Sequence, residues 1–323
     1  MKHHIFFSIL LSVCLLAGCQ SGSYVVFSGY AQGGVYSVKA DLRGVSVPAK
    51  TIQEHIDALL DSIDFSLSGY NKNSLLTKYN RGEEIVPDRF FREVRALSER
   101  YRAETGGAFD AASAPLFDIW GFGFTADSLP DPARVNAALA ACKEEKVLNF
   151  NAIAQGYSCD VVAAYLREIG VENMLVDIGE IYCAGVNAAG RGWTIGVDNP
   201  VDDNVAPGRD LRGIWQSDGG ACGIVTSGNY RKFYIKDGKK YAHTIDPRTG
   251  YPVTHGLLSA TVVAPTAAEA DALATACMVL GPEGAKSLIE GRQDLEGYLI
   301  AADGTWMSEG FRARAQMEDI PQK

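Results

Sequence analysis

The chain has 323 residues, and 47% of them are hydrophobic, which is ample for a buried core in one large domain or two. Its formal net charge of -9 argues against a nucleic-acid surface, because contacts to phosphates need clustered Lys and Arg. After the N-terminal segment, no apolar run is long enough to cross a bilayer. The composition therefore predicts a globular domain that does not bind nucleic acid.

The N-terminus resembles a secretory signal followed by a lipid attachment site. A short basic end precedes an apolar run over 5–16, which is too short for a membrane span. Small residues directly before Cys19 are typical of the bacterial lipobox, and a secretory signal with an incidental Cys19 is the alternative. The lipobox predicts a signal peptide over 1–18, a lipidated tether over 19–23 and a folded domain over 24–323. The protein would then be exported and anchored by lipid to a bacterial membrane, facing the periplasm or the cell exterior.

The cysteines are too widely spaced for a zinc site or a thioredoxin-like redox motif. They lie at Cys14, Cys19, Cys142, Cys159, Cys183, Cys222 and Cys277. Removal of Cys14 with the signal and lipidation of Cys19 leave an odd number, which cannot all pair. Buried free thiols are therefore favoured over a disulfide framework.

The first half of the chain predicts one hairpin and then three helices. Alternating and β-branched residues around a glycine pair indicate antiparallel strands. Capping residues followed by apolar residues at helical spacing indicate the helices. The expected elements are a hairpin over 24–40, a helix from the capping box of Thr51 and Glu54 to about Phe65, a helix that Asp88 caps and Gly106 ends, and a short helix from Asp131-Pro132.

From Val147 onward, strands and helices are interspersed. The expected elements are strands over 147–150, 173–178, 193–197 and 258–264, a helix from Asn151 to Gly170, hairpin turns at Asp237-Gly238 and Asp303-Gly304, and a helix over 267–280 that Gly281-Pro282 closes. Hairpins mixed with separate helices favour an α+β fold over a doubly wound parallel sheet. We therefore expect mixed, largely antiparallel sheets with packed helices.

The most informative polar pair lies in the last of these helices. Thr266 and Glu269 form a capping box that fixes where the helix begins. Asp271 and Thr275 are four residues apart and project from one face, so they offer two hard oxygen ligands to Mg²⁺. The alternative is an Asp stabilised by the helix dipole and a Thr that bonds back to a carbonyl.

A second polar segment passes from an expected strand into a helix over 149–157 and is followed by Asp160. Free N–H groups at such a helix start suit a phosphate, and carbonyls of the preceding turn could reach a cation. The pattern is weak without other support, because strand-turn-helix units are common.

Two further segments combine polar and aromatic residues. His243 lies in a polar turn, where it could handle a proton, stack on a ring or stabilise the turn. The stretches 107–110 and 115–123 combine aromatic residues with glycines, which indicates either a pocket for a flat ring or simply core.

Taken in order, these motifs resemble the ApbE family of FAD:protein FMN transferases. They are Ala-Phe-Asp with Pro-Leu and Trp-Gly-Phe-Gly, then Ala-Ile-Ala-x-Gly-Tyr-x-x-Asp, Thr-Ser-Gly-x-Tyr-Arg, His-x-Ile-Asp-Pro-x-Thr-Gly and Ala-Asp-Ala-Leu-Ala-Thr. Several ordered motifs are far more specific than any one of them. The resemblance implies an ApbE-like, T-fold-like single domain over 24–323.

The resemblance also implies a set of site residues. Mg²⁺ would lie between Asp271, Thr275 and the backbone carbonyl of Ala152. The implied FAD contacts are Gln32, Tyr70, Ala108, Phe109, Asp110, Asn149, Gln155, His243 and Thr244. The chain departs from the family pattern at Asn149, where Asp is usual, at Gln155, where Lys is common, and at Gly179, where a second glycine is expected.

The activity implied by the resemblance is Mg²⁺-dependent transfer of FMN from FAD to a Thr or Ser of another protein, with release of AMP. Implied acceptors are subunits of Na⁺-pumping quinone reductases, Rnf-type complexes and related flavoproteins. His243 is the first candidate for removing the proton of the acceptor hydroxyl, and Asp271 is the second. An FAD pyrophosphatase and a flavin-binding lipoprotein without catalysis are the alternatives.

Overall fold

The computed structural model describes residues 23–123, 129–202, 204, 208–230, 233–236 and 239–317. The expected signal peptide, the lipidation site at Cys19 and the turn at Asp237-Gly238 lie outside the described residues. Within these ranges, no helix combines the length and the apolar character that a membrane crossing requires.

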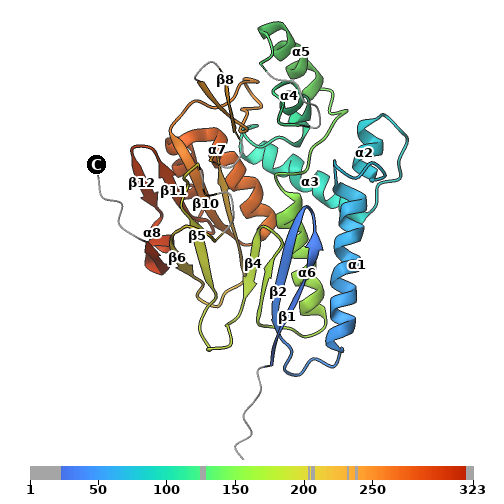
Figure 1. Ribbon diagram of the computed structural model, residues 1–323, viewed down its shortest axis with the longest axis vertical. Helices are drawn as coiled ribbons and strands as arrows, with labels where there is room; N and C mark the ends of the chain where they lie inside the picture. The colour runs from blue at the N-terminus through green and yellow to red at the C-terminus, as the bar shows by residue number, and fades with distance from the viewer. Residues whose placement is uncertain are drawn as a thin grey trace, which may run out of the picture.

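A large antiparallel sheet organises the chain (Figure 1). Its eight strands follow the order β1-β2-β3-β4-β7-β10-β11-β12, and β13-β6-β5 and β8-β9 form two smaller sheets. The strands are β1 (Tyr24–Ala31), β2 (Gly34–Asp41), β3 (Met174–Asp177), β4 (Ile181–Ala184), β5 (Thr194–Asp198), β6 (Leu211–Gln216), β7 (Cys222–Gly228), β8 (Phe233–Lys236), β9 (Lys239–Ala242), β10 (Leu257–Ala264), β11 (Glu296–Ala301), β12 (Gly304–Met307) and β13 (Ala315–Met317).

The helices lie between and after these strands. They are α1 (Ala49–Leu67), α2 (Leu75–Asn80), α3 (Arg89–Glu104), the 3-10 turn η1 (Ala111–Ser113), α4 (Ala114–Ile119), α5 (Pro132–Cys142), α6 (Ala154–Glu168), α7 (Ala267–Glu290) and α8 (Glu309–Arg314). Figure 1 shows α1 and α6 beside β1 and β2, with α4 and α5 gathered at one end of the molecule. These elements make the α+β architecture that the sequence predicts.

The two faces of the large sheet bury different partners. Met174 and Val176 of β3 pack with residues of α1 and α6, while Leu175 between them packs on the other face with residues of β5, β6 and α8. This alternation follows from the two-residue period of a strand. Helices therefore cover one face, and the sheet β13-β6-β5 covers the other.

The start of α7 is held between α6 and β7 at unusually short range. A Cβ atom at Gly156 of α6 would lie 2.3 Å from the carbonyl oxygen of Ala267, and a Cβ at Gly223 of β7 would lie 2.3 Å from the Cα of Ala267. Only glycine allows backbones to approach this closely. Two glycines therefore set the position of the helix that carries the predicted metal ligands.

Most expected elements are confirmed. The first hairpin pairs Tyr24 with Asp41 at one end and Ala31 with Gly34 at the other. Asp88 caps α3 through the N–H of Phe91, and Asp131 caps α5 through the N–H of Arg134. The five described cysteines all carry free thiols, as expected.

The prediction of a capping box at Thr51 and Glu54 is wrong. Helix α1 begins at Ala49, after Pro48, so Thr51 lies inside the first turn and caps nothing. The φ of -61° at Pro48 suits the entry to a helix without any side-chain cap.

The prediction of a strand over 147–150 is also wrong. The N–H of Leu148 donates to the Asn80 side chain and its carbonyl accepts from that same side chain, each at 2.8 Å, while the N–H of Asn149 donates to Ala111. Because a side chain and a loop satisfy the backbone here, the segment needs no neighbouring strand.

The helix over 267–280 is longer than expected. Gly281 has a φ of 76°, which breaks the helix as predicted, but a second helical segment from Pro282 continues to Glu290. Proline is tolerated at the first position of a helix, so the same dipeptide ends one segment and begins the next.

Candidate active site

The junction between α6 and α7 buries a carboxylate. Thr266 caps α7 by accepting the N–H of Glu269 at 3.2 Å, as predicted. Asp271 is only 4% exposed, and its Oδ2 accepts the N–H of Gly156 at 3.1 Å. Thr275 follows one turn later and is partly buried. The structure thus places Asp271 at the interface with the segment that carries Ala152, and Thr275 on the same side of α7.

The electrostatics of this junction are unusual. Burial raises the pKa of Asp271 to about 7, the N–H of Gly156 opposes this shift, and the neighbouring Asp160 adds to it. In the part of the chain that the structure describes, Asp271 has no ion pair with Lys or Arg. A buried carboxylate without a positive partner is costly in its ionised form, so a cation at this position would stabilise it.

Asp160 closes the second polar segment of the sequence, and in the structure it caps a neighbouring helix. Its two oxygens accept the N–H groups of Ala267 and Ala268, each at 2.8 Å, so it caps α7 from α6. Burial raises the pKa of Asp160 to about 6, although both N–H groups act against this shift. The spacing between Gly156 and Asp160, one helical turn, was the sequence signal that both face α7.

The donor set at the junction suits a hard cation. Asp271 and Thr275 offer side-chain oxygens, and Ala152 lies in the turn before α6, partly buried against the same core. The described residues include no group of three or more His, Cys, Asp or Glu placed to hold a metal. A cation at Asp271 would thus need hydroxyl, carbonyl and substrate oxygens, which is the chemistry that Mg²⁺ accepts.

Tyr70 and Asn149 are brought together through Asn151. The Asn151 side chain donates to the Tyr70 hydroxyl at 3.3 Å, and its backbone N–H donates to the Asn149 side chain at 2.8 Å. Tyr70 is 69% exposed, so its ring lies at the surface, where an aromatic side chain can contact a planar ligand. Asn151 was not among the expected site residues, since an exposed Asn before a helix reads as ordinary turn chemistry.

Gln32 reaches α6 from the turn of the first hairpin. Its backbone has a φ of 51°, and its Nε2 donates to Ser158 at 2.5 Å. Its Oε1 is buried without a hydrogen-bond partner among the described residues. An open acceptor at this position could take a donor from a bound ligand.

Two departures from the family pattern lie against each other. The Gln155 side chain donates to the carbonyl of Ile178 at 3.2 Å. Gly179 has a φ of 93°, and a Cβ there would lie 2.7 Å from Nε2 of Gln155. The single glycine thus makes room for the amide of Gln155, which closes the turn by a neutral hydrogen bond.

The segment 108–110 is mainly core. Ala108 and Phe109 are 1% and 2% exposed, so only their backbone could meet a ligand. Asp110 caps η1 through the N–H of Ala112 and pairs with Arg102 at 3.2 Å. Of the two alternatives for this segment, core packing is the one the structure supports for its side chains.

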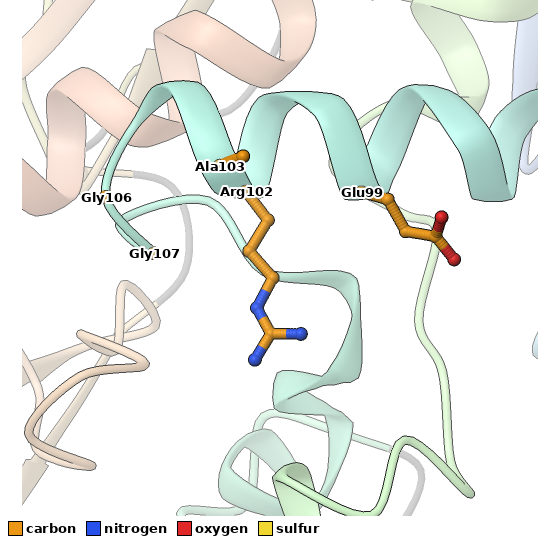
Figure 2. Close-up of a pocket in the computed structure, with 5 residues that line it drawn as sticks. All are labelled: Glu99, Arg102, Ala103, Gly106 and Gly107. Atoms are coloured by element: carbon orange, nitrogen blue, oxygen red, sulfur yellow. The ribbon is translucent and has the colours of Figure 1, made fainter.

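An open cavity of about 440 Å³ lies beside this segment (Figure 2). Its lining residues are Glu99, Arg102, Ala103, Gly106 and Gly107. A Cβ at Gly107 would lie 3.5 Å from the Arg248 side chain, so the His-x-Ile-Asp-Pro-Arg segment closes on the same region. From the sequence, Gly106 and Gly107 are expected to end α3, and Gly107 also begins the stretch 107–110, for which a pocket for a flat ring is one of the two alternatives.

His243 and Thr244 lie after the β8-β9 hairpin. The ring of His243 meets the ring of Phe122 edge to face, with centroids 6.3 Å apart. Thr244 is 8% exposed and donates to the side chain of Asn229. Asp271, the other candidate for proton removal, contacts α6 instead. His243 and Asp271 therefore occupy different surroundings.

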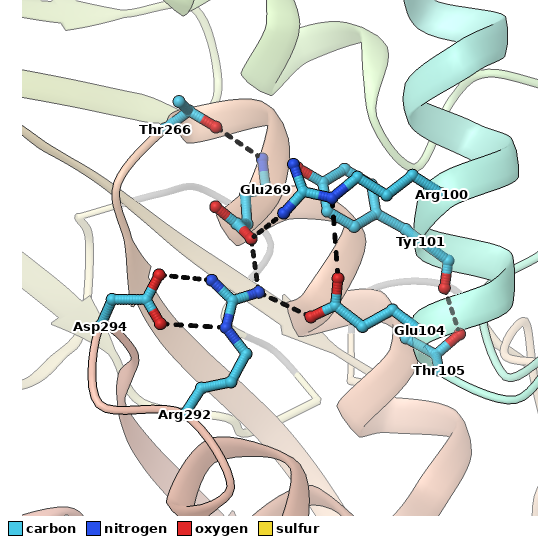
Figure 3. A network of polar contacts seen from close by, with 8 residues as sticks. All are labelled: Arg100, Tyr101, Glu104, Thr105, Thr266, Glu269, Arg292 and Asp294. Carbon is cyan, nitrogen blue, oxygen red and sulfur yellow. Dashed lines mark hydrogen bonds and ion pairs between the residues drawn. The ribbon is translucent and has the colours of Figure 1, made fainter.

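A network of charges fixes the other side of α7 (Figure 3). Glu269 lies between Arg292, at 2.6 Å, and Arg100, at 3.5 Å. Arg292 also holds Glu104 at 2.6 Å and Asp294. The expected capping box is therefore half formed, because the Glu269 side chain binds two arginines and not the backbone of Thr266.

This fold and this junction define a class of α+β protein. Gly156, Gly223 and Asp160 hold the start of α7, and α7 directs the carboxylate of Asp271 toward α6.

The chain belongs to the ApbE family, whose model matches residues 32–299. An FAD:protein FMN transferase of Klebsiella pneumoniae is 33% identical over 97% of this chain and 98% of the relative. The Vibrio cholerae flavin transferase ApbE structure has a TM-score of 0.78 at 32% identity, covering 90% of this chain and 99% of the other. The apo structure of the Pseudomonas stutzeri flavinyl transferase ApbE has a TM-score of 0.78 at 31% identity, and the match covers 90% of this chain and 96% of the other.

Proposed function

We propose that this protein is an FAD:protein FMN transferase, which moves FMN from FAD to a Thr or Ser hydroxyl of another protein and releases AMP. Membership of the ApbE family over nearly the whole domain supports this activity. The observation that carries it is the buried, uncompensated Asp271 at the α6–α7 junction, with Thr275 one turn away.

We further propose that the reaction depends on Mg²⁺. Asp271, Thr275 and the carbonyl of Ala152 would hold the cation, and the raised pKa of Asp271 supports this assignment because a buried acid of this kind gains most from a positive neighbour. Bound Mg²⁺ would offset the negative charge that builds on the diphosphate during phosphoryl transfer.

The chain's own residues would bind and orient the substrates. Tyr70 would offer a surface-exposed ring to a flat group, Gln32 would offer a buried acceptor, and Ala108 and Phe109 would offer only their backbone. Asn149, Gln155, Asp110 and Thr244 complete the proposed FAD contacts. His243 would accept the proton of the acceptor hydroxyl as it attacks phosphorus, and such general-base help is typically worth about 10²- to 10⁴-fold in rate.

We propose an exported lipoprotein as the setting for this activity. Cleavage after 18 and lipidation of Cys19 would anchor the domain to a bacterial membrane, facing the periplasm or the cell exterior. The acceptors would be flavoprotein subunits of Na⁺-pumping quinone reductases or Rnf-type complexes.

One incubation tests the activity against its two alternatives. Purified protein with FAD, Mg²⁺ and an acceptor peptide that contains Thr should yield the peptide with covalent, fluorescent flavin and an equal amount of AMP, both measured by mass spectrometry. Free FMN and AMP without labelled peptide would identify a pyrophosphatase, and unchanged FAD retained on the protein would identify a binding lipoprotein. A parallel incubation with a chelator should abolish labelling, and labelling at the full rate would reject the role of Mg²⁺.

A further inference from the structure

Two cysteines that the proposed reaction does not use face each other across neighbouring strands. Cys183 ends the pairing of β4 with β7 directly opposite Cys222. Their sulfur atoms are 3.7 Å apart and share a hydrogen bond. In the described part of the chain, Cys142, Cys159 and Cys277 have no sulfur neighbour of this kind.

The backbone geometry at this pair already suits a covalent bond. Residues directly opposite in an antiparallel pair have Cα atoms about 4.5 to 5.5 Å apart, and disulfides are found with Cα separations of about 4.4 to 6.8 Å. The remaining change is in the side chains, whose sulfurs must close from 3.7 Å to about 2.05 Å. No strand has to move for the bond to form.

The two thiols also differ in a way that suits oxidation. Cys183 is fully buried among the apolar residues between the two sheets, whereas Cys222 is partly exposed at the edge of that cluster. Cys222 is therefore the sulfur that an oxidant can reach, and Cys183 lies beside it as the thiol that can resolve a mixed disulfide.

We propose that Cys183 and Cys222 form a reversible disulfide that links β4 to β7. The oxidant is a small or protein disulfide. The Cys222 thiolate attacks it, forming a mixed disulfide and releasing one thiol. The Cys183 thiolate then attacks the sulfur of Cys222 and releases the second thiol, so the pair loses two electrons and two protons and the oxidant gains them.

The bond would brace the strand that supports the candidate active site. Cys222 directly precedes Gly223, whose backbone lies against Ala267 at the start of α7. The disulfide would also close a loop between positions 39 residues apart, which restricts the unfolded chain. The inference rests on the strand register and the sulfur positions, and it holds whether or not the protein transfers flavin.

Peptide mapping tests the bond directly. The folded full-length protein, reduced and then treated with glutathione disulfide, is alkylated and cut with trypsin. Cleavage after Arg167, Arg191 and Arg212 puts the two cysteines in separate peptides, so the expected product is a linked pair that dithiothreitol separates. The Cys142→Ala variant should give the same linked pair, and Cys183→Ala and Cys222→Ala should give none.

Thermal unfolding tests the consequence. Oxidised protein should melt about 5 °C or more above the reduced protein, and Cys222→Ala should melt at one temperature under both conditions. Failure of the folded protein to form the linked peptides, or a link from Cys222 to any other cysteine, would overturn the proposal. A linked pair with no rise in melting temperature would overturn the bracing effect.

Discussion

The two faces of the large sheet bury very different chemistry. On the helical face, Asp271 and Glu269 are each 4% exposed at the start of one helix. On the opposite face, the rings of Trp215 and Tyr298 stack on Phe311, with centroids 6.1 and 5.7 Å away. Burying an acid destabilises the folded state unless the acid is paired, whereas burying aromatic surface stabilises it. Asp271 on the helical face, which has no ion pair with Lys or Arg among the described residues, therefore needs a functional explanation, and stability alone explains the stacked rings on the other face.

This contrast predicts that variants on the two faces fail in opposite ways. A change at Asp271 should remove activity from a folded protein. A change in the aromatic cluster should unfold the protein while each folded molecule remains active. The largest effect should come from Asp271.

Asp271→Asn should lower the rate of flavin transfer by about 10³-fold, since a neutral amide cannot supply the charge that holds Mg²⁺, and a metal ion is worth several kcal/mol to the transition state. The amide oxygen can still accept the N–H of Gly156, so the fold should survive. Transfer is followed by the fluorescence of labelled acceptor, and folding by circular dichroism. Unchanged transfer would contradict the role of Asp271, and an unfolded variant would contradict the division between the faces.

Trp215→Ala is the matching change on the aromatic face. Trp215 is fully buried, and its removal should lower the free energy of unfolding by about 3 to 5 kcal/mol through lost burial and a cavity. Chemical denaturation measures this loss. The transfer rate per folded molecule at low temperature should stay within about twofold of the wild type. A loss comparable to that of Asp271→Asn would mean that the two faces are coupled.

The helical face was only partly predictable from sequence. Capping at Thr266 and the four-residue spacing of Asp271 and Thr275 are local, so the chain order alone places them. The N–H of Gly156 on Asp271 joins residues 115 positions apart, and local spacing carries no record of such a contact. Glu269 shows the same limit, because two distant arginines compete successfully with its expected partner on the local backbone.

The aromatic face and the loops also contain contacts that local sequence patterns do not predict. Alternation in β3 predicts that Leu175 faces away from Met174 and Val176, but it does not say which layer lies there. The segment 147–150 has the residue types of a strand and forms none, because Asn80 satisfies its backbone. Tertiary partners override local propensity in such cases.

Asp160→Asn, also on the helical face, should lower both stability and the transfer rate, but by less than the two variants above. An Asn can accept one of the two N–H groups of Ala267 and Ala268 but turns an NH₂ group toward the other. We expect a loss of about 1 to 2 kcal/mol in the free energy of unfolding, since one buried donor loses its partner. Transfer should fall by about tenfold as the start of α7 shifts. Glu168→Gln, which neutralises an exposed acid at the end of the same helix, is the matched control and should change the rate by less than about threefold.

Tyr70 should give the smallest effect, and it separates ligand binding from both kinds of burial. Because Tyr70 is 69% exposed, Tyr70→Ala should leave the free energy of unfolding within about 0.5 kcal/mol of the wild type. Loss of a stacking ring should raise KM for FAD by about five- to tenfold, in line with about 1 kcal/mol for an aromatic pair, and should leave kcat within about twofold. Tyr70→Phe keeps the ring and removes only the hydroxyl that accepts from Asn151, so its KM should stay close to the wild type. Equal rises in KM for the two variants would place the effect in the hydroxyl, and a fall in kcat alone would contradict a binding role for the ring.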